Sequence, residues 1–360
     1  MSKIWCAISS HGFGHAAQLV PVLNELGRRR PDLEVYLRTA LPSSFFKETL
    51  EIHWELSPSK QDIGCIQDGP LHIDSKKTWD AYRLFHENWE ERIGEEVDVI
   101  ERVRPQCVLS NISYLSITAG VKAGCPTMAL ASLSWDQVLE DYRCADNVEH
   151  SRIIEQIRQA YRGCHKLIRP FPGIPMVAFP DIQDVGPVLS PMVSLHGDIR
   201  HRLRLNASDR IVLVAFGGIP LSSLPLSQLE TIKGYHFLVS GALDCEGCQR
   251  VTAIDVMGLS FREILSSADI IMTKPGYATI VEAVRGDRPI VYVRRYNFAD
   301  EQPLVDFAHR YGRAVELTLK DFEDGRWEQA LDQVLRLPFP TEFMPAEGTA
   351  IAAEQILAIL

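Results

Sequence analysis

A loop near the start of the chain combines two glycines with two histidines: Ser9-Ser10-His11-Gly12-Phe13-Gly14-His15. It follows a short apolar run typical of a buried strand and precedes a segment with leucines at helical spacing. Glycines let the backbone approach a ligand closely, and the start of a helix offers free N–H groups. Because a helix N-terminus disfavours imidazolium, we expect His15 to be neutral and able to accept a proton. The alternative is a tight strand–helix turn with a polar histidine cap, since a glycine loop alone is weak evidence.

A second candidate follows an apolar run at residues 269–273 and reads Lys274-Pro275-Gly276-Tyr277-Ala278-Thr279. The free N–H groups of the helix expected from about residue 277 could hold a diphosphate, with Thr279 adding a hydroxyl and Lys274 a positive charge. Glu282, one turn further along, could accept hydrogen bonds from ribose hydroxyls. Ordinary helix capping, with Glu282 merely suiting the helix dipole, is the alternative.

Three weaker patterns follow other predicted strands. Asp300-Glu301-Gln302 combines carboxylate and amide groups that suit a sugar diol, and Gly217-Gly218 is a further glycine turn facing the same edge. Ser134-Trp135-Asp136 offers a carboxylate and an aromatic platform for an acceptor. Helix capping explains Asp300 and Asp136 equally well.

Composition excludes several classes of protein. The net charge of −10 argues against nucleic-acid binding, and the basic run at residues 28–30 suits a helix C-terminus better than a phosphate-binding patch. Eight scattered cysteines favour reduced thiols over a disulfide framework.

No signal peptide and no apolar run long enough to span a bilayer is present, so we expect a cytoplasmic protein with at most peripheral membrane contact. The chain has no Asp-x-Asp pair, so we expect no metal, with helix dipoles and Lys274 stabilising the leaving group instead.

Strand and helix patterns alternate in both halves, which predicts an α/β protein with parallel sheets. We expect long helices at residues 79–103 and 138–161. A proline-rich stretch at 169–191 reads as the crossover between domains, unable to sustain a central strand. The predicted domains are residues 1–180, with a C-terminal helix at 345–360 packing back on them, and residues 190–342. The carboxyl ends of the strands would face each other across a central cleft.

At these residues the chain resembles the GT-B nucleotide-sugar glycosyltransferases, and more narrowly glycosyltransferase family 28. The segments Gly12-Phe13-Gly14-His15-Ala16 and Ser134-Trp135-Asp136, residues 170–180, and Val293-Arg294-Arg295 with Glu301 are similar to the N-terminal, glycosyltransferase-like half of plant L-arabinokinases. That likeness spans nearly the whole chain. The sequence contains no counterpart of the kinase half, so the resemblance implies the two Rossmann-like domains and the donor cleft more strongly than a reaction.

From its place at the helix start, His15, aided by Asp136, is predicted to act as the general base. The resemblance implies roles for further residues. The remaining predicted residues would bind the donor: the diphosphate, the ribose (Glu282), the sugar (Glu301 and Gln302) and the base (backbone near Met257 and Gly258). In full, this donor set is Gly12, Phe13, Gly14, Gly217, Gly218, Met257, Gly258, Lys274, Gly276, Tyr277, Ala278, Thr279, Glu282, Glu301 and Gln302.

The predicted function is metal-independent, inverting transfer of a sugar from a nucleoside-diphosphate donor, expected to be UDP, to an unidentified hydroxyl acceptor. The implied type is a hexosyl- or N-acetylhexosaminyl-transferase that needs no cofactor, with a nucleotide sugar as its small-molecule partner. A nucleotide-sugar hydrolase or epimerase of the same fold is an alternative, and so is a protein that binds nucleotide sugars without turnover.

Overall fold

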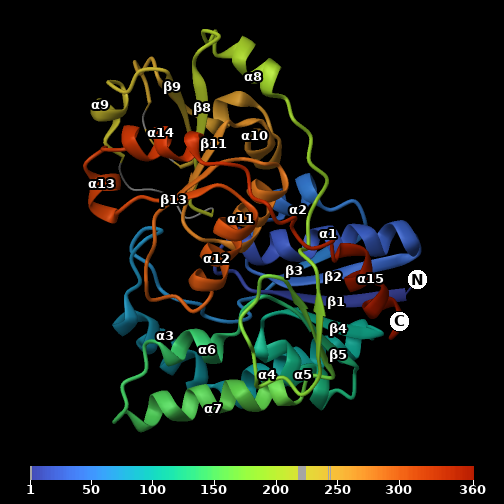
Figure 1. Cartoon of the computed structure of the whole chain (residues 1–360). Coiled ribbons are helices and arrows are strands. Elements are labelled where there is room, and N and C mark those ends of the chain that lie inside the picture. The colour runs from blue at the N-terminus through green and yellow to red at the C-terminus, as the bar shows by residue number, and fades with distance from the viewer. Residues whose placement is uncertain (1, 218–223, 242, 244) are drawn as a thin grey trace.

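The computed structural model describes residues 2–217, 224–241, 243 and 245–360. Strands and helices alternate along the chain and build two parallel sheets, one in each half, flanked by helices (Figure 1). This confirms the predicted α/β architecture. Short apolar runs form the buried strands, as expected for parallel sheets covered on both faces.

The first sheet has seven strands in the order β3-β2-β1-β4-β5-β6-β7, all in parallel pairs. Its strands are β1 (Ser2–Ile8), β2 (Leu33–Thr39), β3 (His53–Pro58), β4 (Cys107–Asn111), β5 (Thr127–Leu130), β6 (Lys166–Pro170) and β7 (Ile182–Val185). Its helices are α1 (Phe13–Arg29), α2 (Ser43–Thr49), α3 (Ser75–Glu87), α4 (Trp89–Val103), α5 (Tyr114–Lys122), α6 (Trp135–Glu140) and α7 (Val148–Arg162).

The second sheet has six strands in the order β10-β9-β8-β11-β12-β13, again in parallel pairs. Its strands are β8 (Arg210–Val214), β9 (Tyr235–Val239), β10 (Val251–Ala253), β11 (Ile270–Thr273), β12 (Ile290–Tyr292) and β13 (Ala314–Glu316). The helices after β7 are α8 (His196–Arg202), α9 (Leu226–Leu229), the 3₁₀ helix η1 (Ile254–Met257), α10 (Phe261–Ser267), α11 (Tyr277–Arg285), α12 (Glu301–Tyr311), α13 (Leu319–Glu323), α14 (Glu328–Arg336) and α15 (Thr349–Leu357).

Both long helices predicted for the first half are wrong in length, because each is interrupted: Asn88 separates α3 from α4, and residues 141–147 separate α6 from α7. Asn88 has non-helical backbone angles. Asn147 begins α7 by accepting hydrogen bonds from the backbone N–H groups of Glu149 and His150, which separates α7 from α6. Asparagine favours such positions because its side chain competes for backbone hydrogen bonds.

The proline-rich stretch is not all crossover, since it contributes the end of β6 and the edge strand β7. The sheet of the first half therefore extends past residue 180. An edge strand tolerates nearby prolines because one side of its ladder needs no donors.

The chain passes between the halves twice, and the two passages touch. The backbone N–H of Gly348 donates to the Pro187 carbonyl at 2.8 Å, and the Leu189 N–H donates to the Thr349 hydroxyl at 3.1 Å. Helix α15 then returns to the first half beside α1, where Ala352, Ala353 and Ile356 join its apolar core (Figure 1).

Candidate active site

A pocket of about 100 Å³ lies where loops from both sheets meet. Its walls follow the carboxyl ends of β1, β4 and β5 in the first half and of β8, β11 and β12 in the second. This is the edge at which open parallel sheets place ligands. The pocket is lined by His11, Gly12, Gly14, His15, Gln18, Asn111, Ala131, Ser132, Leu133, Gly217, Lys274, Pro275, Gly276, Tyr277, Ala278, Thr279, Arg295, Phe298 and Asp300. The two loops singled out in the sequence therefore share one pocket.

His15 stands in the first turn of α1 and is held by the end of β4. Its Nδ1 lies 2.7 Å from Oδ1 of Asn111. Burial lowers the pKa of His15 to about 4, and the charge of Lys274 adds to this effect, while the bond to Asn111 opposes it. The imidazole is therefore neutral at physiological pH, and it can accept a proton.

His11 is fixed differently. Its Nδ1 accepts from the backbone N–H of Cys65 at 3.2 Å, which puts the ring proton of neutral His11 on Nε2. That Nε2 lies 3.4 Å from Nε2 of Gln67, whose Oε1 has no partner among the described residues. Exchanging the oxygen and nitrogen of the Gln67 amide would satisfy both groups. Burial lowers the pKa of His11 well below its usual value, so the ring is neutral and its Nδ1 is occupied.

The structure does not bring Asp136 into the pocket. Its carboxylate is buried against α7, where Oδ2 pairs with Nε of Arg158 at 3.3 Å. Trp135, next to it, is also buried, and its ring lies 5.6 Å from that of His15 and 5.3 Å from that of His11. Asp136 was predicted to assist the base, but the helix turns its side chain away from the histidines.

A different carboxylate, Asp62, supports the floor of the site. It accepts from Trp135 Nε1 and from the Ser9 hydroxyl, both at 2.9 Å. Burial raises the pKa of Asp62 to about 6. Asp62 thus ties the tryptophan ring to the loop that carries both histidines.

The turn before α11 contributes the opposite wall. Gly276 caps the helix without a side-chain hydrogen bond, so the first N–H groups of α11 point toward the pocket without a side-chain partner. Lys274 stands beside Gly217, and burial together with the charge of Arg295 lowers the pKa of this ammonium group. A dipole end and a desolvated lysine form an environment that favours an anion.

Asp300, not Glu301 or Gln302, brings a carboxylate to the pocket after β12. Burial raises the pKa of Asp300, and its Oδ1 has no hydrogen-bond partner among the described residues. Glu301 is buried and accepts from the backbone N–H groups of Arg295 and Tyr296 and from the Arg295 guanidinium. Gln302 is exposed and bonds Asp306 on its own helix. Of the predicted sugar-binding pair, Glu301 therefore shapes the loop and Gln302 faces outward, while Asp300 before them faces the pocket.

Four other predicted donor residues lie outside the pocket lining. Phe13 stacks on Phe45, with ring centroids 5.0 Å apart, and packs against the apolar core of the first half that α15 joins. Glu282 is buried, and its Oε1 pairs with Nε of Arg262 at 3.2 Å. Met257 and Gly258 end η1, beyond β10. Gly218 lies outside the described residues.

The two halves are in contact around this pocket. A Cβ on Gly12, whose φ is +121°, would lie 3.4 Å from the Gly217 carbonyl oxygen across the cleft. The Tyr142 hydroxyl donates to the Asn297 carbonyl, and the Phe298 ring stacks on His11 with centroids 6.3 Å apart. The pocket between these contacts is smaller than the about 300–1,000 Å³ that sites for small molecules usually enclose, and we call this narrow arrangement the closed cleft.

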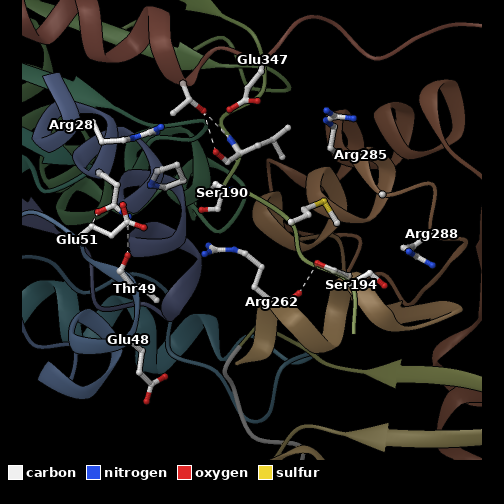
Figure 2. A pocket seen from close by; sticks show the side chains of 18 residues that line it. Arg28, Glu48, Thr49, Glu51, Ser190, Ser194, Arg262, Arg285, Arg288 and Glu347 are labelled. Carbon is white, nitrogen blue, oxygen red and sulfur yellow. Dashed lines mark hydrogen bonds between the residues drawn. The ribbon is translucent and has the colours of Figure 1, made fainter. Parts of the chain in front are cut away.

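A larger cleft of about 790 Å³ opens on the crossover side of the molecule. Figure 2 shows Arg262 directed toward the first half, while Arg285 and Arg288 lie apart from it, beyond the crossover. Glu48 and Glu51 line the cleft from the first half, and Glu347 lies apart from them (Figure 2). The cleft is larger than the pocket, but its charged groups do not converge on one point, so we place the chemistry in the pocket.

Comparison with solved structures identifies the fold. CalG4, the calicheamicin glycosyltransferase, matches with a TM-score of 0.67 and 15% identity over 100% of this chain and 98% of its own. Medicago truncatula UGT71G1, solved with UDP-glucose, matches with a TM-score of 0.58 and 12% identity over 99% of this chain and 98% of its own. Arabidopsis thaliana UGT89C1, solved with UDP, matches with a TM-score of 0.63 and 14% identity. The chain has the GT-B fold.

Among curated proteins, an L-arabinokinase from Arabidopsis thaliana is 27% identical over 333 residues. The match covers 92% of this chain and 32% of that protein, so the chain spans about a third of its relative. No family model matches the sequence. The predicted resemblance to GT-B proteins and to L-arabinokinase is thus confirmed, while the narrower likeness to family 28 stays a prediction.

Sequence reasoning missed Gln18, Asn111 and Phe298 of the pocket lining, and Asp62, which bonds Trp135 and Ser9 beside it. Asn111 carried a signal, because Ser110 and Asn111 follow the apolar run at residues 107–109, and the end of a parallel strand lies at the carboxyl edge of its sheet. Asp62 and Phe298 lie in irregular loops, where no periodicity reports the direction of a side chain.

Proposed function

We propose that this protein transfers a sugar from a nucleoside-diphosphate sugar to a hydroxyl acceptor, with UDP as the proposed nucleotide. One observation carries the proposal: a single pocket between the two sheets holds a neutral histidine on one side and an uncapped helix N-terminus on the other. The GT-B fold supports it, as do the UDP-glucose and UDP in the structures of UGT71G1 and UGT89C1.

In this proposal the N–H groups at the start of α11, with Thr279 and Lys274, hold the diphosphate. Lys274 is desolvated and disfavours its own charge, so an anion beside it would be stabilised by restoring that charge. These groups would stabilise the leaving diphosphate without a metal ion. Asp300, with an unpartnered oxygen, would accept hydrogen bonds from the sugar.

His15 would act as the general base. As the acceptor oxygen bonds to the anomeric carbon, its O–H bond breaks and the proton passes to Nε2 of His15, while the bond from that carbon to the diphosphate breaks and the diphosphate leaves with the electron pair. A single displacement of this kind inverts the anomeric centre. General-base catalysis contributes about 10²–10⁴-fold. The closed cleft would exclude water, which otherwise competes with the acceptor.

The test begins with the donor. A thermal-shift panel of nucleotides and nucleotide sugars ranks ligands, since one present at 100 times its Kd stabilises a protein by about 2.7 kcal/mol. With the best donor, we expect His15→Gln to lower turnover by about 10²–10⁴-fold with donor affinity nearly unchanged. His53, exposed on β3, provides the matched control His53→Gln.

Glu282→Gln tests the other side of the site. We propose that Glu282 binds the donor ribose once its pair with Arg262 opens, so this variant should weaken donor binding with less effect on turnover. Normal turnover in both His15→Gln and Glu282→Gln would refute the assignment of the site. Sugar release without an acceptor would indicate a hydrolase, and donor binding without turnover under any acceptor would indicate a binding protein.

We place the protein in the cytoplasm, with at most peripheral contact with a membrane. In the described part of the chain, none of the helices combines the length and apolarity needed to cross a bilayer. The hexosyl or N-acetylhexosaminyl nature of the sugar is part of the proposal that the panel would test.

A further inference from the structure

A chain of buried amides connects His15 to the interior of the first half. Nδ2 of Asn111 donates to Oε1 of Gln18 at 2.8 Å. Nε2 of Gln18 donates to the Ser132 hydroxyl at 3.0 Å. Asn111 and Gln18 are both buried, so no solvent competes for these groups.

The contacts in this chain give each amide a direction. Because the NH₂ group of Asn111 is engaged by Gln18, the atom that faces His15 is the carbonyl oxygen Oδ1, an acceptor without a proton. Rotating the Asn111 amide alone would bring two acceptors together at Gln18, and rotating both amides would require the Ser132 hydroxyl to donate instead of accept. With Oδ1 of Asn111 facing it, the ring nitrogen of neutral His15 on that side carries the proton.

We propose that Asn111 and Gln18 are positioning residues that hold His15 in the tautomer protonated on Nδ1, so that Nε2 is left as the acceptor. The use of that acceptor in catalysis rests on the proposed function, but the tautomer itself does not. His11, in the same loop, has the opposite arrangement, with Nδ1 accepting from Cys65. The two histidines of one loop are thereby divided into a proton acceptor and a hydrogen-bond donor.

An asparagine here has a consequence that a carboxylate would not have. The amide orients the ring but adds no negative charge that would stabilise imidazolium. The titratable and charged groups facing His15 are His11 in its own loop and Lys274 after β11, with Arg295 and Asp300 beyond them after β12. The nearest charge, on Lys274, is positive, so the geometry keeps His15 a weak base that does not retain a proton.

The experiment is NMR of the full chain labelled with ¹⁵N-histidine, with His15→Gln used to assign the signal. Long-range ¹H–¹⁵N spectra distinguish the two tautomers directly. We expect His15 to carry its proton on Nδ1 and to remain neutral down to about pH 5, since its pKa is about 4. A spectrum with the proton on Nε2, or an imidazolium at pH 6, overturns the proposal, and this measurement needs no variant that must fold.

Two variants then test the positioning residues. Asn111→Asp places a carboxylate beside Nδ1 and should raise the measured pKa of His15 by about 1–3, moving the acid limb of the pH–rate profile with it. Gln18→Leu frees the Asn111 amide, so both tautomers should appear, whereas Gln333→Leu on the exposed face of α14 should leave the spectrum unchanged. An unshifted pKa in folded Asn111→Asp, or a single tautomer in folded Gln18→Leu, refutes the proposal. If the spectra agree but no transfer is found, the proposed function fails and the positioning network stands.

Discussion

Phe298 offers a way to open the closed cleft. It belongs to the loop after β12, yet it is 7% exposed within an apolar cluster whose other buried members all come from the first half. Its ring lies nearly parallel to that of His11, at an interplanar angle of 9°. The side chain of one half is thus buried in the core of the other, beside the pocket.

The size of the effect follows from this burial. Fully burying a phenylalanine side chain stabilises by about 1.5–3 kcal/mol. The guanidinium of Arg295 also lies over the ring at 3.9 Å, but it belongs to the same loop and moves with it, so that contact does not count toward closure. At about 1.5–3 kcal/mol, Phe298→Ala would shift the ratio of closed to open molecules by about 12- to 150-fold toward the open form.

Small-angle scattering measures the opening. A compact chain of this length has a radius of gyration of about 21 Å, and we expect a larger value for Phe298→Ala than for the wild type, decreasing when donor is added. Transfer should slow, and sugar release to water should increase relative to transfer, because the open cleft admits solvent. Phe298→Leu keeps most of the apolar contact and should resemble the wild type. Scattering and product ratios in Phe298→Ala equal to those of the wild type would refute the reasoning.

Two further predictions concern the crossover and the pocket. A Cβ on Gly186 would lie 1.7 Å from the Ala346 carbonyl oxygen, so Gly186→Ala should lower the free energy of unfolding, measured with denaturant, by more than about 2 kcal/mol. The control Gly94→Ala, in the open middle of α4, should raise it by about 0.5–1 kcal/mol. Equal effects of the two substitutions would argue against the contact. The pKa of Lys274 is lower in the folded state than the value of 10.5 that the unfolded chain has. At pH values between the folded-state pKa and 10.5, the unfolded state binds one more proton than the folded state, so stability rises with pH. Below both pKa values the lysine contributes no pH dependence. A bound diphosphate would favour the protonated lysine, so calorimetry should find proton uptake on UDP binding. The affinity for UDP should fall as pH rises between the two pKa values, and Lys274→Met should abolish both effects. A wild type without proton uptake would contradict the assignment of Lys274 to the diphosphate.

Much of the fold was readable from the sequence, because parallel strands are short apolar runs whose ends are marked by glycine and polar residues. The run before the histidine loop and the run before Lys274 both formed strands followed by helices, as predicted. Helix length was less accessible. The predicted helices ran through Asn88 and Asn147, whereas in the folded chain Asn88 has non-helical backbone angles and Asn147 accepts the hydrogen bonds that begin α7.

Within the site, backbone features were predictable and side-chain directions were not. The glycine loop and the start of α11 had to lie at the carboxyl edges of their strands. By contrast, the direction of the side chains in Asp300-Glu301-Gln302 depends on a loop whose N–H groups recruit Glu301, which leaves Asp300 to face the pocket. Asp136 was misplaced for the same kind of reason, since Arg158 on a helix 22 residues away draws its carboxylate aside.

Burial has one consistent effect on the ionisable groups of the pocket. It lowers the pKa of His11, His15 and Lys274 and raises that of Asp300, so each group is pushed toward its uncharged form. A dianionic ligand in this pocket would favour the protonated lysine, so ligand binding would itself cause Lys274 to take up the positive charge that pairs with the ligand. His15 gains less from the ligand, because Asn111 offers it a neutral partner and because the diphosphate would lie against α11 and Lys274 on the opposite wall. The pocket thus places the positive charge that the ligand induces on the leaving-group side and leaves the acceptor side with a base that holds a proton only while the new bond forms.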